Sequence, residues 1–345
     1  MAHGGMGWPF ALGSRGKAVG FFQAGTWSPV VFNGHGRQPG ALLQVVGELR
    51  GSQMVEDLIA KAEVLLEALP YIQQFHGAMV LVKFGGSAME DPEVTSRVLK
   101  DIAFMESAGM RPVIVHGGGK AITAELKRQE IPTRFVNGLR YTCDRTIKVV
   151  DRVLHDDVNA MLVDSLQQWG ARAAAVSGKD VLRCRRISSV DKETGEELDL
   201  GYVGEVVNVD VEQIKWVMGR NEIPVITPLA CDMNGRVFNI NADMAACRIA
   251  AQMKVRKLVF LSDVPGVLAD PADPDSLIST IRTGEIDSLA EKGIISGGML
   301  PKLRSAADAL RAGVSKVHLI DGRLPHSLLL EFFTDKGIGT QIILA

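Results

Sequence analysis

The sequence is poor in several features that mark special classes of protein. Its 345 residues contain four cysteines and no C-x-x-C pair, which argues against a zinc knuckle and fits a reducing compartment. The 38 Lys and Arg residues are balanced by 40 Asp and Glu residues, so there is no basic excess for a generic nucleic-acid or anionic-membrane surface. No stretch approaches the roughly 20 consecutive apolar residues of a membrane-spanning helix. We therefore expect a cytoplasmic protein that binds neither nucleic acid nor membrane.

The first 53 residues differ in composition from the rest of the chain. They hold 12 of the 36 glycines, and no Asp or Glu precedes Glu48. Their aromatic residues follow no period, so we interpret residues 1–53 as a poorly ordered extension. A transit peptide is one alternative, although Ser and Arg are few. A misassigned start codon is another, because regular patterning begins at Met54.

An amphipathic helix is predicted after this extension. Its apolar residues recur at i, i+3, i+4 and i+7, the spacing of one helix face. We expect Pro70 to kink or end the helix. The residues alone favour a helix that packs on its own domain, and the alternative is an N-terminal arm, residues 54–78, that packs against another subunit. The apolar stripe consists of Val55, Leu58, Ile59, Ala62, Leu65, Leu66 and Leu69.

Six short apolar runs follow, and amphipathic helical stretches separate most of them. This alternation indicates an α/β fold with a mostly parallel sheet covered on both faces. Residues 192–197 are typical of a charged hairpin turn. Since open α/β sheets bind ligands beyond the carboxyl ends of their strands, site residues should follow the strands. The predicted strands are Met79–Phe84, Val113–His116, Ala173–Val176, Val225–Thr227, Leu258–Ser262 and Val317–Ile320, and the predicted helices include Pro92–Ser107, Lys120–Arg128, Arg145–Trp169 and Lys302–Ala312.

Glycine-rich loops follow the first two strands of this pattern. The first loop is VKFGGS, residues 82–87, and the second is VHGGGK, residues 115–120, which runs directly into a helix. Successive glycine N–H groups before a helix form an anion cradle, although a tight turn is the commoner role of one such pair. Neither loop is a Walker A motif or a Rossmann fingerprint. Together they favour a phosphate or carboxylate site at one sheet edge.

Four charged residues lie near the expected strand and helix ends. Lys83 interrupts an apolar strand, so its ammonium group must reach solvent or an anion. Lys302 opens a helix, where a cation opposes the macrodipole unless an anion lies between them. Asp243 precedes an Ala-rich helix and is either a plain N-cap or a carboxylate that holds two lysines. Arg140 suits a carboxylate ligand, but a lone arginine is more often a surface residue.

The order of these motifs resembles that of the amino-acid kinase family. The chain contains KFGG, HGGG, NGLR, N-x-N-A-D, SDVPG and GGM-x-x-K, and NGLR together with NINAD narrows the resemblance to the N-acetyl-L-glutamate kinases. The resemblance implies an α/β fold, a three-layer αβα sandwich around a mostly parallel open sheet. It also implies an N-lobe at residues 79–240 that binds acetylglutamate and a C-lobe at residues 241–345 that binds ATP.

The resemblance further implies a reaction and the residues that perform it. The γ-phosphoryl group of ATP would pass to the side-chain carboxylate of N-acetyl-L-glutamate, with Mg²⁺ arriving on ATP and no dedicated protein ligand for the metal. Such a transfer needs positioning and electrostatics more than covalent chemistry. The matched positions are Lys83 and Lys302 as transition-state lysines, Asp243 as the carboxylate that orients both, Gly85 and Gly86 for the phosphoryl group, Gly117, Gly118, Arg140 and Asn239 for the substrate, and Ser262, Asp263, Gly266, Val267, Leu268, Ile294 and Ser296 for the nucleotide.

The resemblance covers a matched region of roughly residues 79–344, and a finer resemblance concerns segments near its two ends. The helix before Pro70 and the segment FFTDKGIGT, residues 332–340, are similar to those of arginine-inhibited, hexameric members of the family. It implies that N-terminal helices interlace the subunits and that the effector L-arginine binds near His318, Glu331 and Gly337. Some members also bind a PII-type signal protein. Cys143 departs from the family pattern and has no role that we can assign.

Two other functions fit parts of the sequence. One is a kinase of the same fold that acts on glutamate or aspartate, although Arg140 argues against carbamate and nucleotide acceptors. The other is a non-catalytic, arginine-sensing, kinase-like module of an acetylglutamate synthase. Such a synthase adds a domain of ~100–150 residues, and here only Ala345 follows the matched region. The joint presence of Lys83, Asp243 and Lys302 favours catalysis.

Overall fold

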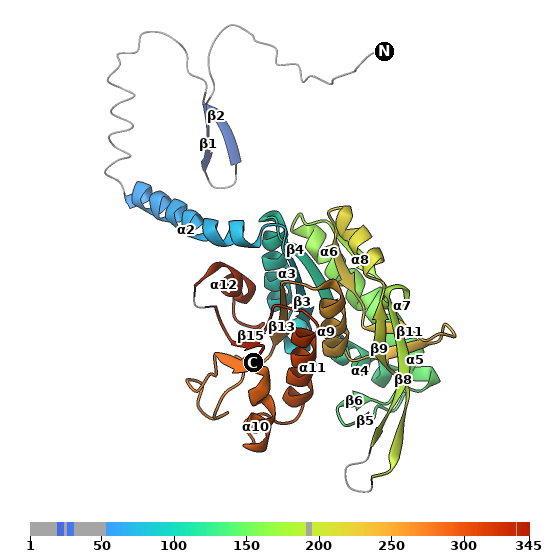
Figure 1. Cartoon of the computed structure of the whole chain (residues 1–345). Coiled ribbons are helices and arrows are strands. Elements are labelled where there is room, and N and C mark those ends of the chain that lie inside the picture. Colours follow the sequence, from blue (N-terminus) through green and yellow to red (C-terminus); the bar gives the residue numbers. More distant parts are fainter. Residues whose placement is uncertain (1–18, 24–25, 31–52, 191–194, 336) are drawn as a thin grey trace, which may run out of the picture. The chain divides into compact units, whose positions relative to one another are not determined.

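The computed structural model describes residues 19–23, 26–30, 53–190, 195–335 and 337–345 (Figure 1). The chain divides into two compact units, residues 1–67 and residues 68–345. In the first unit, strand β1 (Val19–Gln23) pairs antiparallel with strand β2 (Thr26–Val30), a pairing that the sequence pattern did not predict. The rest of the predicted extension up to residue 52 lies outside the described residues. In the described part of the chain, no helix is long and apolar enough to cross a membrane.

Helix α2 (Gln53–Phe75) is the predicted amphipathic helix, and it does not end at Pro70. A proline removes one i→i−4 hydrogen bond, but packing at the end of a helix offsets that loss. Here Phe75 is buried, and its ring meets the ring of Phe332 edge to face with centroids 5.3 Å apart. Packing of the last turn therefore favours continuation of the helix through the proline.

An eight-stranded sheet forms the centre of the second unit. Its strand order is β14-β16-β15-β13-β3-β4-β10-β7, and every pairing is parallel except the β15–β16 pair. All six predicted strands are present in this sheet. The strands are β3 (Met79–Phe84), β4 (Arg111–His116), β7 (Ala173–Val176), β10 (Ile223–Ile226), β13 (Lys257–Ser262), β14 (Thr280–Arg282), β15 (Lys316–Asp321) and β16 (Thr340–Ile343).

Helices cover both faces of this sheet, which confirms the three-layer αβα architecture (Figure 1). Alternate residues of a strand point to opposite faces. On β3, Val80, Val82 and Phe84 join one core cluster and Leu81 joins the other. The first layer holds α3 (Pro92–Ser107), α4 (Gly119–Arg128), α5 (Asp144–Arg152), α6 (Ala160–Gln168) and α12 (Ser327–Phe333), and the second holds α8 (Val211–Gly219), α9 (Ala242–Met253), α10 (Ile286–Glu291) and α11 (Met299–Arg311).

The remaining strands form two smaller sheets. A closed four-stranded barrel joins β8 (Leu182–Val190), β9 (Glu197–Val209), β11 (Leu229–Cys231) and β12 (Val237–Ile240). The β8–β9 pair is the predicted hairpin, and residues 191–194 of its turn lie outside the described residues. A short hairpin joins β5 (Phe135–Val136) and β6 (Leu139–Arg140). Short helical segments complete the fold: the 3-10 segments η1 (Gly86–Met89) and η3 (Thr283–Glu285), the π-helix η2 (Val153–Asn159) and α7 (Gly178–Val181).

The lobes predicted at residues 79–240 and 241–345 share the eight-stranded sheet. The first contributes β3, β4, β7 and β10, and the second contributes β13 to β16. Both lie in the single unit of residues 68–345. That residues 79–240 bind acetylglutamate and residues 241–345 bind ATP therefore stays a prediction.

Candidate active site

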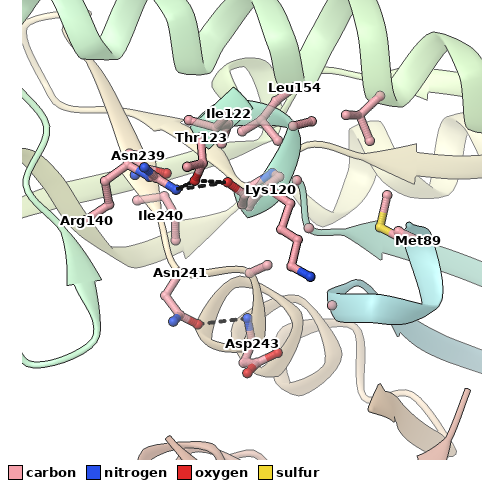
Figure 2. A pocket seen from close by; sticks show the side chains of 18 of the residues that line it. Met89, Lys120, Ile122, Thr123, Arg140, Leu154, Asn239, Ile240, Asn241 and Asp243 are labelled. Atoms are coloured by element: carbon pink, nitrogen blue, oxygen red, sulfur yellow. Dashed lines mark hydrogen bonds between the residues drawn. The ribbon is translucent and has the colours of Figure 1, made fainter. Parts of the chain in front are cut away.

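A cavity of about 800 Å³ opens beyond the carboxyl ends of β3 and β4. Its walls include eight of the residues that the sequence analysis selected, and Figure 2 shows the side chains around it. These eight come from widely separated parts of the chain, as expected for the end of a parallel sheet. They are Lys83, Gly86, Gly117, Gly118, Arg140, Asn239, Asp243 and Asp263.

Lys83 lies at this edge because of its position in β3. It has the same strand parity as Leu81, so it faces the layer that contains α9. Its Nζ atom lies 2.9 Å from Oδ1 of Asp243, on the first turn of α9, and the lysine side chain is only 11% exposed. The ammonium group has therefore found a carboxylate, which removes the cost of burying it unpaired.

Lys302 reaches the same carboxylate from the other side. Its Nζ atom lies 2.8 Å from Oδ2 of Asp243, and it also lies 5.1 Å above the ring of Phe260. Asp243 does not cap α9, because the Oδ1 atom of Asn241 accepts a hydrogen bond from the amide of Asp243 (Figure 2). The same Oδ1 atom accepts a second hydrogen bond from the amide of Met244. The N-cap alternative is therefore wrong, and the carboxylate is left for the two lysines.

The cluster of Lys83, Asp243 and Lys302 carries a net positive charge. Burial raises the pKa of Asp243, but the two ammonium groups outweigh burial and lower that pKa to about 2. The carboxyl group is therefore ionised at neutral pH, and two cations surround one anion. The remaining positive charge faces a cavity, so the site can stabilise an added anion such as a phosphoryl group.

The two glycine loops approach each other at the same place. A Cβ atom on Gly117 would lie 3.4 Å from Cα of Gly85, and one on Gly85 would lie 2.9 Å from Nζ of Lys83. A Cβ atom on Gly118 would lie 2.5 Å from Cδ2 of Leu154. Gly85 does not line the cavity but lies directly behind the lysine. The glycines therefore allow the loops, the ammonium group and η2 to share a small space.

Arg140 and Asn239 lie on the wall formed by α4 and the two smaller sheets. Arg140 is buried, and its Nη2 atom donates to the carbonyl of Gly119 and to Oγ1 of Thr123, each at 2.9 Å (Figure 2). Its Nη1 atom is buried and has no hydrogen-bond partner among the described residues. Asn239 donates to Thr142 Oγ1 at 3.3 Å. A buried arginine with an unused donor suits a carboxylate ligand.

The residues predicted to bind nucleotide lie around the end of β13 and before α11. Ser262 ends β13, and Asp263 lines the cavity. Val267 is a core residue whose amide donates to Thr340 Oγ1 and whose carbonyl accepts from Ile278. Gly266 adopts φ 151°, where a Cβ would meet Thr340 Oγ1 at 2.5 Å. Of the residues predicted to bind nucleotide, Asp263 lines the cavity, and Ser262, Gly266, Val267, Leu268, Ile294 and Ser296 do not. The contact of all seven with a nucleotide stays a prediction.

A second buried cluster lies away from the cavity, between the start of β13 and α12. The predicted effector residues His318, Glu331 and Gly337 lie together there. Nδ1 of His318 is 2.6 Å from Oε1 of Glu331, and a Cβ on Gly337 would be 2.9 Å from Oε2. Nζ of Lys257 is 2.7 Å from Oε1 of Glu331 and lies above the rings of Phe75 and Phe332. Sequence reasoning missed Lys257, because its partner is 74 residues away.

Sequence reasoning also missed several residues that line the cavity. Lys120 forms an ion pair with Glu90 that links α4 to the segment after η1. The ring of Phe135 lies 4.6 Å from the guanidinium carbon of Arg140. Leu154, Val158 and Met161 form an apolar wall. Only Lys120 belonged to a selected motif, and the others carry no pattern that separates them from ordinary core residues.

Comparison with known proteins gives consistent results over most of the chain. The model of the amino acid kinase family matches residues 78–321. Acetylglutamate kinase of Brachyspira hyodysenteriae is 46% identical over 281 residues, which cover 81% of this chain and 96% of that protein. Acetylglutamate kinase of Pelotomaculum thermopropionicum is 46% identical over 288 residues, 82% of this chain and 97% of that protein.

Solved structures show the same fold. N-acetylglutamate synthase from Neisseria gonorrhoeae, complexed with coenzyme A and N-acetyl-glutamate, superposes with a TM-score of 0.72 at 25% identity. The match covers 82% of this chain and 63% of that one. Carbamate kinase from Giardia lamblia bound to AMP-PNP superposes with a TM-score of 0.57 at 16% identity, covering 78% of this chain and 99% of that one. At this identity, the second match supports the fold alone.

Proposed function

The chain belongs to the amino acid kinase family, and we propose that it transfers the γ-phosphoryl group of ATP to the side-chain carboxylate of N-acetyl-L-glutamate. The relatives named acetylglutamate kinase align along almost their whole length, which supports the acceptor. The product would be an acyl phosphate, formed in a step of arginine biosynthesis. As the sequence analysis predicts, we place this reaction in the cytoplasm.

The observation that carries the proposal is the net positive cluster at the cavity, which Lys83 and Asp243 line and Lys302 does not. Lys83 and Lys302 hold one carboxylate between them, and the spare positive charge is available to a phosphoryl group in transfer. Arg140, which lines another wall of the same cavity, has an unused donor for a carboxylate of the acceptor. A loose phosphoryl-transfer transition state spreads charge over several oxygens, and fixed cations stabilise that charge.

Mg²⁺ is part of the proposal as an ion carried by ATP. In the described ranges, no group of three His, Cys, Asp or Glu side chains is arranged to hold a metal ion. We therefore assign the ion to the triphosphate, where it would neutralise charge on the β- and γ-phosphates. Lys83, Lys302 and the glycine loops would supply the protein's own contribution.

A coupled assay of ADP release tests the proposed function. We expect release to depend on N-acetyl-L-glutamate and to stay near background with L-glutamate or L-aspartate. Phosphorylation of only an unacetylated acid would support the other kinase alternative. ATP binding without phosphorylation of any acid would support the non-catalytic sensor.

We also propose that L-arginine binds at the Glu331 cluster and inhibits the enzyme. A buried carboxylate beside the aromatic rings of Phe75 and Phe332 suits a guanidinium group, which pairs with carboxylates and stacks on rings. A Neisseria gonorrhoeae N-acetylglutamate synthase of similar fold is described in complex with L-arginine. Inhibition requires that arginine favour one of two conformations of the enzyme. Titration of arginine into the ADP-release assay, with Glu331→Gln as the insensitive variant, tests this proposal.

We further propose a homo-oligomer, a hexamer, assembled through α2. Within this helix, Leu58, Ile59, Leu65 and Leu66 are each more than half exposed, which is unusual for large apolar side chains on one stripe. Light scattering of the purified protein measures the assembly mass. We expect Leu65→Glu to break it into smaller species, whereas Glu63→Lys should leave it intact. A PII-type signal protein is a further candidate partner, and co-elution in the presence of ATP tests it.

A further inference from the structure

His116 ends β4 inside the VHGGGK loop, yet it does not line the cavity. Its side chain is completely buried. Its Nδ1 atom lies 2.7 Å from the carbonyl oxygen of Gly117, and its Nε2 atom lies 3.1 Å from Nδ2 of Asn159. Asn159 Nδ2 also donates to the carbonyl of Val225 at 2.8 Å. The imidazole therefore bridges the glycine loop and the end of η2.

Only one arrangement of protons satisfies these contacts. The carbonyl of Val225 can only accept, so the Asn159 atom that faces it must be the amide nitrogen. The second hydrogen of that nitrogen points to Nε2 of His116, which must accept. Nδ1 then carries the ring proton and donates to the carbonyl of Gly117. Burial lowers the pKa of His116 to about 4, so the neutral ring required by this arrangement prevails at neutral pH.

This arrangement fixes the direction of a peptide group in the cavity wall. The Gly117–Gly118 peptide is trans, so its carbonyl and its N–H point to opposite sides. The carbonyl points to the buried imidazole, and both glycines line the cavity on the other side. Two glycines in sequence have no side chains to restrict this peptide, so a flip is easy unless a partner holds it.

We propose that His116 is a positioning residue, which holds the carbonyl of Gly117 so that the N–H of Gly118 is directed at the phosphoryl acceptor. The inference rests on the proposed function, since it names the means by which the site orients the acid. Asn159 takes part by fixing the ring and its tautomer. A donor that is already oriented stabilises developing charge without reorganisation during the reaction.

The π-helix η2 explains how Asn159 reaches the imidazole. Asn159 is the last residue of η2, and Leu154 of the same segment packs so closely on Gly118 that a Cβ there would lie 2.5 Å from its Cδ2 atom. One widened helical segment therefore contacts the glycine loop from two sides. Such π-turns are frequent at functional sites. Neither contact was predicted from the sequence, because His116 and Asn159 are 43 residues apart.

A pair of amide substitutions separates the two hydrogen bonds of His116. The side-chain amide of His116→Asn can place a donor where Nδ1 was, so it keeps the bond to Gly117. The longer His116→Gln places its amide near the Nε2 position and keeps only the contact with Asn159. Both variants are polar, and each loses one hydrogen bond, so they are matched controls. Thermal unfolding of both verifies that they fold.

Steady-state kinetics with N-acetyl-L-glutamate and ATP provide the readout. We expect His116→Gln to lose on the order of 10- to 100-fold in kcat/KM for the acceptor, with the KM for ATP within about twofold of wild type. We expect His116→Asn to retain most of the wild-type kcat/KM for the acceptor. Equal losses in the two variants, no loss in either, or an equal rise in both KM values would overturn the proposal.

A spectroscopic measurement on the wild-type protein needs no variant. The ¹⁵N chemical shifts of the His116 ring distinguish the two neutral tautomers, and we expect the proton on Nδ1. A proton on Nε2, or a cationic ring at pH 7, contradicts the proposal even if both variants fail to fold. If the wild-type enzyme phosphorylates no N-acetyl-L-glutamate, the proposed function fails, which is distinct from an active enzyme with equally impaired variants.

Discussion

Asp243 and Glu331 are two carboxylates with little solvent exposure that each contact two basic side chains, and of the two only Asp243 lines the cavity. Asp243 lies between Lys83 and Lys302, and Glu331 lies between Lys257 and His318. In each cluster burial raises the carboxyl pKa, and the basic partners then lower it to about 2. The two carboxylates are therefore alike: each is ionised at neutral pH, and basic side chains offset its negative charge.

The two clusters differ in net charge. Both partners of Asp243 are lysines, so that cluster has a surplus of one positive charge. Burial lowers the pKa of His318 below its ordinary value, so the histidine is mainly neutral at pH 7 and the Glu331 cluster is balanced by Lys257 alone. A surplus cation beside a cavity attracts an anion, as expected for the Asp243 cluster. A charge-balanced pair such as Glu331 and Lys257 instead contributes to the fold, or binds a cationic ligand that takes the place of the lysine.

The strongest test of this comparison is Lys83→Met. Lys302 remains to neutralise Asp243, so we expect little change in unfolding temperature. The surplus charge disappears, and kcat should fall on the order of 10³-fold, about 4 kcal/mol of transition-state stabilisation. ADP-release kinetics and a thermal melt measure the two effects. Retention of more than a tenth of wild-type kcat would contradict the catalytic assignment of Lys83.

The corresponding change in the other cluster is Lys257→Met. It leaves the nearly unexposed carboxylate of Glu331 with a neutral histidine and the amide of Ile338, but with no cation. Breaking a buried pair in this way is strongly destabilising, and we expect a loss of about 3 kcal/mol in the free energy of unfolding. Urea unfolding measures it. The double variant Lys257→Met/Glu331→Leu should regain most of the stability, because no buried charge is then left unpaired.

Acid unfolding distinguishes the two carboxylates from His116, because their contributions to stability are lost over different pH ranges. The folded-state pKa values of Asp243 and Glu331 are lowered to about 2, below their ordinary values of 3.8 and 4.5, so the unfolded chain takes up protons first. Their stabilisation is complete above pH 4.5 and is lost as the pH falls toward 2. The pKa of His116 is lowered from 6.5 to about 4, so it adds a loss between those values.

Urea unfolding of variants at a series of pH values shows which group causes each loss of stability. Glu331→Gln should remove about 3 kcal/mol of the stability that the wild-type protein loses in the lower pH window. His116→Asn should flatten the upper window and leave the lower one unchanged. A Glu331→Gln protein with the wild-type slope below pH 4.5 would mean that folding does not lower the pKa of this carboxyl group.

Much of the fold could be predicted from local pattern, because each central strand is a continuous apolar run. β3 and β7 have the predicted bounds, and α3 matches its predicted range. The short strands β14 and β16 were missed, since they have three and four residues with little periodicity. The stretch Arg145–Trp169 was predicted as one helix, but η2 interrupts it. A widened turn depends on tertiary packing and leaves no local signal.

The candidate site was predictable where a charge breaks a pattern. Lys83 in an apolar strand and Lys302 at a helix start both indicated a missing anion, and the structure brings both to Asp243. Lys257 gave no such signal, because a lysine that begins a strand is ordinary. His116 was part of the recognised loop, but its role depends on a distant asparagine. Pairwise contacts between distant segments therefore decide what the sequence pattern alone leaves open.

The smallest expected effect concerns the space around Lys83. In Gly85→Ala, the new Cβ would lie 2.9 Å from the Lys83 Nζ atom, so the ammonium group must shift by a few tenths of an ångström. The long side chain can move, so we expect little loss of stability but a decrease of about 10-fold in kcat, roughly 1.4 kcal/mol. Gly219→Ala is the matched control, since its Cβ meets nothing within 4 Å on α8. Equal kinetics for the two variants would show that catalysis tolerates this shift of the Lys83 ammonium group. The contrast between the Asp243 and Glu331 clusters would then rest on their net charge alone.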